Sequence, residues 1–166
     1  MNEASRVLIA TQDLQLRSMV EGLLRALRAR TTHVLDERML LAYLGTPEGF
    51  DLVVVDAAWE GLSVHAVQRA CRARSRSLSE THVLVILPQG ATSTEVIGAF
   101  NDGADFVVRQ PLRPLEFLNA CRVGERLTLL TRGRRSLDEA DERLARTAPK
   151  TEAVPVTEVI SLGLGR

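Results

Sequence analysis

The residue with the clearest chemical potential is Asp56, which ends the apolar run Asp51–Asp56. Other apolar runs end close to polar or charged side chains, and these are Thr11, Gln12, Asp13, Arg109 and Gln110. If the runs are parallel strands, their carboxyl ends meet at one edge of a sheet, where the functional crevice of such sheets lies. A carboxylate at that edge is close to loops and helix termini that can bind an anion or a metal ion.

Short runs rich in Val, Ile and Leu alternate with helical patterns along the chain. The predicted strands are Arg6–Ala10, Thr32–Leu35, Asp51–Asp56, His82–Leu87 and Asp105–Arg109. The predicted helices between them span 13–28, 36–44, 63–74 and 92–102, with Asp13 as the first N-cap. The third run shows no alternation of apolar and polar residues, which is typical of a parallel strand covered on both faces. The sequence therefore predicts an α/β fold: a flavodoxin-like (βα)5 doubly wound parallel sheet.

A last helical pattern begins at Pro114 and continues to about Arg146, further than a compact domain needs. We expect a globular body over 1–125, an extended C-terminal helix over 126–147 and a flexible tail over 148–166. Four leucines on the extension repeat at helical spacing with no sheet to cover: Leu127, Leu130, Leu137 and Leu144. They predict an interaction helix that buries against a partner helix or a second copy, although Arg134 and Asp141 interrupt the stripe.

The tail is more apolar than a plain solvated end, since Val154–Leu164 carries several aliphatic residues. Two interpretations stay open. It could dock on a partner as a linear motif, or it could be a disordered end with no role.

Composition excludes several classes of function. The formal net charge is zero and aromatic residues make up 4% of the chain, which disfavours binding to nucleic acid or to an anionic membrane surface. No apolar run is long enough to span a membrane, and a cytoplasmic protein is expected. Cys71 and Cys121 lie far apart in helical patterns, which favours two buried thiols over a disulfide. The 21 basic residues include a single lysine, Lys150, which falls in the tail.

Three further possibilities find little support in the sequence. Arg134 lies four residues before Asp138, so an ion pair along the helix is expected in place of a free, DNA-binding arginine. The three histidines share no ligand spacing with the cysteines, which disfavours zinc. The absence of a G-x-G-x-x-G loop disfavours a flavin or dinucleotide site.

The chain resembles the receiver domains of response regulators over roughly residues 5–125. The resemblance depends on Arg6–Ala10, on Asp51–Asp56 and on the segment Gly103–Pro111, at the spacing that the family shows. It implies that Asp56 matches the aspartate that receivers phosphorylate. It also implies that Pro111 matches the proline that follows their active-site lysine.

The departures from the family pattern concern its chemistry. The resemblance places Thr11 and Gln12 where receivers carry two magnesium-binding acidic residues, leaving Asp13 one position later. Loss of two carboxylates predicts at most a weak magnesium site at Asp13 and Asp56. The remaining matches put Leu87 at the Ser/Thr position, Gln110 at the lysine and Val107 at the aromatic switch residue. An amide in place of the lysine loses the positive charge that stabilises phosphoryl transfer.

The resemblance and its departures together predict a pseudo-receiver. Such a module would bind other proteins in a bacterial, two-component-type pathway and would have no enzymatic activity or required cofactor. The alternative is a working response-regulator receiver that is phosphorylated at Asp56. No residue pattern identifies the partner.

Overall fold

The computed structural model describes residues 4–46, 49–73 and 81–147, and there the chain forms a five-stranded parallel sheet with the order β2-β1-β3-β4-β5. The strands are β1 (Arg6–Ala10), β2 (Arg30–Val34), β3 (Leu52–Asp56), β4 (His82–Leu87) and β5 (Phe106–Arg109). The helices are α1 (Leu14–Ala26), α2 (Glu37–Leu44), α3 (Val64–Ala73), α4 (Ser93–Asn101) and α5 (Pro114–Thr147). This strand order is the flavodoxin-like order of doubly wound sheets, so the predicted fold class is confirmed.

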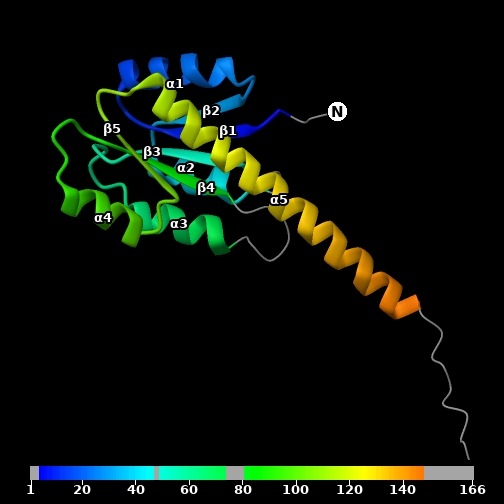
Figure 1. The fold of residues 1–166 in the computed structure, drawn as a ribbon. Coiled ribbons are helices and arrows are strands. Elements are labelled where there is room, and N and C mark those ends of the chain that lie inside the picture. Colours follow the sequence, from blue (N-terminus) through cyan, green and yellow to red (C-terminus); the bar gives the residue numbers. More distant parts are fainter. Residues whose placement is uncertain (1–3, 47–48, 74–80, 148–166) are drawn as a thin grey trace, which may run out of the picture.

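Helices cover both faces of the sheet (Figure 1). Successive side chains of a strand point to opposite faces. Val53 and Val55 therefore pack toward α2, α3 and α4, while Leu52 and Val54 pack toward α1 and α5. Every residue of β3 and β4 is buried, which is why these runs show no polar alternation. Because all the strand pairs are parallel, the carboxyl ends of the five strands lie at one edge of the sheet.

Polar side chains begin the helices where the sequence places them. Asp13 accepts hydrogen bonds from the amides of Gln15 and Leu16 at the start of α1. Asp36 has the same role before α2, and Thr92 forms a capping box with Glu95 before α4. Each cap satisfies backbone donors that the helix itself leaves without acceptors, and so determines where the helix starts.

The predicted bounds differ from the observed ones by one or two residues at several ends. The first helix was expected to reach Arg28, but α1 ends at Ala26 because Arg28 adopts a left-handed conformation with φ of 57°. The second strand was expected at Thr32–Leu35, yet β2 starts at Arg30. Its register decides this, since Arg30 lies opposite Arg6 and the two strands pair along the whole of β1.

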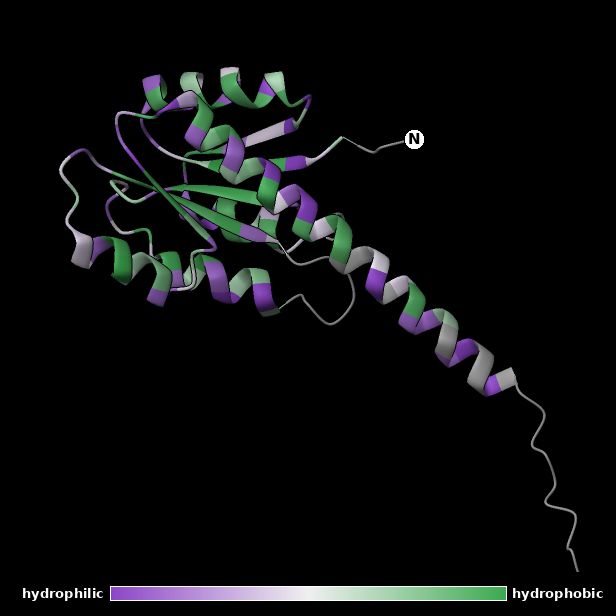
Figure 2. Ribbon diagram, in the orientation of Figure 1, coloured by the Kyte–Doolittle hydropathy of each residue, from purple (hydrophilic) through white to green (hydrophobic). Residues whose placement is uncertain are grey.

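Helix α5 is a single uninterrupted helix that packs on the sheet and then leaves the body (Figures 1 and 2). Phe117 and Cys121 of α5 are buried against α1 and the sheet. Gly124 lies beside Phe106 of β5, and an added methyl group would make an ordinary van der Waals contact with it at 3.4 Å. Within the described residues, no helix is long and apolar enough to cross a membrane.

Candidate functional site

Asp56 is buried at the carboxyl end of the central strand and its carboxylate is held by neutral donors. The Thr11 hydroxyl donates to Asp56 Oδ2 at 2.7 Å, and the amide of Ala58 donates to Oδ1 at 3.0 Å. Thr11 is 2% exposed and Asp56 is 4% exposed, so water has little access to this hydrogen bond. Among the described residues, no arginine or histidine forms an ion pair with Asp56. The site therefore satisfies the carboxylate with hydrogen bonds alone.

The side chains of the two residues after Thr11, Gln12 and Asp13, form hydrogen bonds with other partners. Asp13 Oδ1 accepts from the first amides of α1 at 2.8 and 3.1 Å, so this carboxylate serves as a helix cap. The Asp13 amide donates to the Thr11 hydroxyl at 3.1 Å, which orients that hydroxyl toward Asp56. The Gln12 side chain is exposed and reaches the carbonyl of Leu35 at 3.5 Å. Thr11 alone of the three has its side chain on Asp56.

This arrangement offers few ligands to a magnesium ion, and the weak site expected at Asp13 and Asp56 stays a prediction. Magnesium requires several oxygen ligands in near-octahedral geometry, usually carboxylates and water. Thr11 and Gln12 add no carboxylate to those of Asp13 and Asp56, and Asp13 Oδ1 caps the start of α1. Within the described part of the chain, no group of three or more acidic, histidine or cysteine side chains could hold a metal ion.

Leu87 lies at the end of β4 and is buried in the core on the α3 side. Its carbonyl accepts a hydrogen bond from the amide of Gln110 at 2.9 Å, which joins the ends of β4 and β5. The backbone thus brings Leu87 and Gln110 together at the edge of the sheet. The buried aliphatic side chain offers no hydroxyl to a phosphoryl group at this position.

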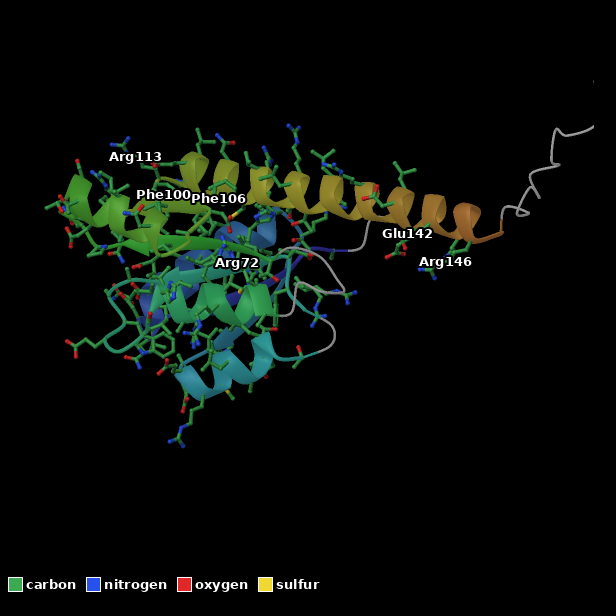
Figure 3. The ribbon with its side chains drawn as sticks, turned by 90° about the horizontal axis from the view of Figure 1, so that it is seen from below. Arg72, Phe100, Phe106, Arg113, Glu142 and Arg146 are labelled. Atoms are coloured by element: carbon green, nitrogen blue, oxygen red, sulfur yellow. The ribbon has the colours of Figure 1, made fainter. Side chains whose placement is uncertain are left out.

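Gln110 and Pro111 line a cavity of about 560 Å³ between α4, β5 and the start of α5. The other lining residues are Gly90, Val96, Val107, Arg109, Arg113 and Glu116. The charged residues of this lining are Arg109, Arg113 and Glu116. Neither arginine forms an ion pair within the described residues. Figure 3 shows Arg113 where α5 begins. The cavity is net positive, and Arg109 belongs to its lining.

The opposite edge of the sheet holds carboxylates with a structural role. Asp51 Oδ2 accepts from the Arg6 amide at 2.8 Å, and Asp105 Oδ2 accepts from the Val83 amide at 2.7 Å. His82 lies beside Asp105 at 3.7 Å and is 6% exposed. These groups pair the amino ends of the strands, away from Asp56.

The predicted interaction helix, 126–147, is the last part of α5. Leu127, Leu130 and Leu137 are exposed, whereas the side chain of Leu144 is outside the described set, as is the tail 148–166. The expected ion pair between Arg134 and Asp138 was wrong, because it does not form in the structure; water screens exposed pairs and leaves them little net stability. A pair does form about two turns later, between Glu142 and Arg146 at 3.5 Å (Figure 3).

Sequence reasoning missed the hydrogen bond from Thr11 to Asp56 and the cavity lined by Arg113. Thr11 was noted only as a lost acidic residue, although a hydroxyl beside a buried carboxylate is a natural donor. The cavity had no clear signal, since it depends on how α4 and α5 are spaced over β5. Trp59, in the loop after Asp56, is 7% exposed and packs in the core.

No protein-family model matches this sequence, and no curated protein matches it either. Solved structures do share its fold. NtrX from Brucella abortus superposes with a TM-score of 0.68 at 20% identity; the match covers 81% of this chain and 29% of NtrX. The chain therefore spans less than a third of that protein.

Two isolated receiver domains are covered almost completely. The receiver domain of Francisella response regulator 1452 gives a TM-score of 0.61 at 18% identity, over 74% of this chain and 98% of that domain. A response-regulator receiver domain from Bermanella marisrubri gives 0.60 at 18% identity, over 72% of this chain and 97% of that one. At these identities the similarity shows the fold: this chain has the fold of receiver domains.

Proposed function

We propose that this chain is a receiver-like signalling module that acts by protein–protein binding in a two-component-type pathway, without efficient phosphorylation of Asp56. The observation that carries the proposal is the hydrogen bonding and burial of the Asp56 carboxylate. Its two oxygens accept hydrogen bonds from Thr11 and Ala58, and the residue is almost fully buried. A carboxylate that accepts from two protein donors is a poorer nucleophile than one that faces a metal-bound phosphodonor.

The charges around Asp56 also favour this proposal. Phosphoryl transfer needs positive charge near the transferred group to offset the negative charge that develops. The only lysine in the chain is Lys150, and Gln110 supplies a neutral amide near the end of β5. Arg109 and Arg113 line the cavity between α4 and α5. We therefore assign the positive charge of both arginines to a binding surface at this cavity and not to the Asp56 carboxylate.

Two surfaces are available for partners under this proposal. One is the net-positive cavity between α4, β5 and α5. The other is the outer side of α5, where Leu130 and Leu137 are 70% and 69% exposed. Large aliphatic side chains repeated on one side of a helix are costly to leave in water and are typical of helix–helix interfaces.

Incubation with acetyl phosphate and magnesium, read by intact-mass spectrometry, tests the proposal. We expect the mass of the wild-type chain to stay unchanged. Thr11 and Gln12 supply no carboxylates for magnesium, and Gln110 supplies no positive charge to the transferred phosphoryl group. Stoichiometric phosphorylation that disappears in Asp56→Asn would contradict the proposal and would favour the working receiver.

A gain-of-function variant provides the positive control. The triple variant Thr11→Asp, Gln12→Asp and Gln110→Lys places carboxylates and an ammonium where the receiver pattern has them. We expect this variant to acquire magnesium-dependent phosphate on Asp56 under the same conditions. Circular dichroism of both proteins checks that the fold is retained, since Thr11 is buried.

A further inference from the structure

The outer side of α5 carries an apolar stripe that faces away from the sheet. Phe117 and Cys121 bury the inner side of the helix, while Leu130 and Leu137 lie on the other side and are exposed. Their seven-residue separation is two helical turns, so they share one face. Figure 2 shows that hydrophobic and hydrophilic segments alternate where α5 extends past the body. We refer to the face with Leu130 and Leu137 as the outer stripe.

Charge is distributed unevenly along the same part of α5. Residues 132–135 read Arg-Gly-Arg-Arg, and residues 138–142 read Asp-Glu-Ala-Asp-Glu. A basic block is thus followed by an acidic block, and the boundary between them falls at Ser136 and Leu137. Arg134 and Asp138, one from each block, form no ion pair with any described residue. Both charges are available to a partner.

We propose that α5 pairs with α5 of a second copy of this chain as an antiparallel helix pair centred near Leu137. The inference deepens the proposed function and rests on its assignment of α5 as an interaction surface; it does not depend on the state of Asp56. The second copy is the occupant because the helix is complementary to itself in charge and carries the apolar stripe that the contact buries.

Charge complementarity determines the antiparallel orientation. In an antiparallel pair centred near Leu137, block 132–135 of one helix lies beside block 138–142 of the other, and the same contact occurs twice by symmetry. In a parallel pair each block meets its own copy, so like charges oppose each other at both blocks. Arg134 lies in the stripe between Leu130 and Leu137, and only the antiparallel arrangement brings an acidic residue of the second copy close to it.

The same polar residues limit the strength of the pair. An arginine in the apolar stripe lowers the stability of a helix pair while specifying its register and orientation. We therefore expect a dimer that dissociates on dilution and at high salt, because part of its stability is screened ion pairing.

Spin-label distances in the full chain test the orientation. Arg126→Cys and Ala140→Cys are exposed positions on α5, and the wild-type chain, whose two cysteines are buried, is the unlabelled control. The antiparallel pair predicts labels about 30 Å or more apart at position 126 and less than about 20 Å apart at position 140. Short distances at both positions would show a parallel pair and overturn the proposal.

Charge reversal tests the contact itself. Arg134→Glu places an acidic residue beside the acidic block of the second copy, and we expect the dimer dissociation constant at low salt to rise about tenfold or more. Arg126→Glu is the matched control, because position 126 lies opposite no part of the partner's α5; we expect its dissociation constant to change less than about twofold. Sedimentation equilibrium measures both, and unchanged dimerisation of Arg134→Glu would overturn the proposal.

The two proposals fail in different ways. A wild-type chain that stays monomeric at every concentration overturns the helix pair and leaves the phosphorylation result unaffected. Phosphorylation of wild-type Asp56 overturns the proposed function while the spin-label distances are unchanged.

Discussion

At Asp56 the surroundings of a single side chain decide what it can do. The carboxylate keeps the position at the end of β3 that the receiver fold provides, but its donors are a threonine hydroxyl and a backbone amide. Neutral donors stabilise a buried carboxylate without supplying the charge that phosphoryl transfer needs. The proposal that Asp56 is not efficiently phosphorylated therefore depends on its neighbours.

A second position depends on the absence of a side chain. Gly103 has φ of 102°, and an added Cβ would overlap Gln68 Cγ. The Gln68 amide donates to the Gly103 carbonyl at 2.7 Å, which holds that side chain in place. Gly90 has a similar φ of 87°, but an added Cβ there would meet open space. Comparing alanine substitutions at the two glycines therefore separates the cost of backbone strain from the cost of steric overlap.

We expect Gly103→Ala to lower the free energy of unfolding more than Gly90→Ala. The shared backbone strain costs about 1–2 kcal/mol in each variant. Overlap with Gln68 adds about 1–3 kcal/mol for Gly103→Ala alone. Urea denaturation of both variants measures the difference, and equal losses would show that Gln68 moves aside freely.

At the scale of elements, α5 changes role along its length. Its first part is a core helix over the sheet, and its last part extends beyond the sheet (Figure 1), where the side chains that the structure describes are exposed. Glu125 lies where the two parts meet. Burial raises the pKa of Glu125 above its usual value of 4.5; the negative charge of Asp51 adds to this, while a hydrogen bond with Ser5 and the charge of Arg122 partly oppose it. The ionised carboxylate is therefore less favourable in the folded chain than in the unfolded one.

We expect Glu125→Gln to unfold at a higher temperature than the wild type at pH 7. Because its pKa is raised, the contribution of Glu125 to stability is most favourable below pH 4.5 and is lost as the pH rises through the folded-state pKa. The glutamine cannot ionise, so the advantage of the variant should shrink as the pH falls toward 4. Thermal denaturation across pH 4–8 measures this; a difference that stays constant with pH would contradict the assigned cause.

At the scale of the whole molecule, the described residues form two cores, one on each face of the sheet, and each contains one free cysteine. Cys71 is buried on the α2–α4 side, and Cys121 is buried on the α1 and α5 side. Burial raises the pKa of both thiols to about 12, with smaller contributions from the charges of Asp105 and Glu125 respectively. Each thiol thus reports on the opening of one face.

We expect neither thiol of the folded chain to react with a thiol reagent at pH 7.5 except through unfolding. Above the usual thiol pKa of 9.0, the unfolded chain ionises while the folded chain does not. Stability should therefore be unaffected below pH 9 and fall between pH 9 and 12, by up to about 1.4 kcal/mol per pH unit for each thiol. Urea denaturation of Cys71→Ala and Cys121→Ala identifies each contribution, and rapid labelling of either thiol would indicate local opening of that face.

The sequence by itself determined the order and type of the elements. Apolar runs such as Leu52–Val55 have no alternation because both faces of the strand are covered, and caps such as Asp13 act through bonds to amides two or three residues away. These are local effects, so the sequence carries them directly. Strand ends were less certain, since pairing with a neighbour decided where β2 begins.

Only the tertiary structure decided the chemistry of the site. Thr11 and Asp56 are 45 residues apart, and their hydrogen bond exists because β1 and β3 are neighbours in the sheet. The cavity lined by Arg113 depends on the spacing of two helices over β5. The exposed state of the α5 stripe likewise follows from which side of the helix the sheet takes up. Contacts between distant segments depend on packing geometry, which residue types and spacing alone do not specify.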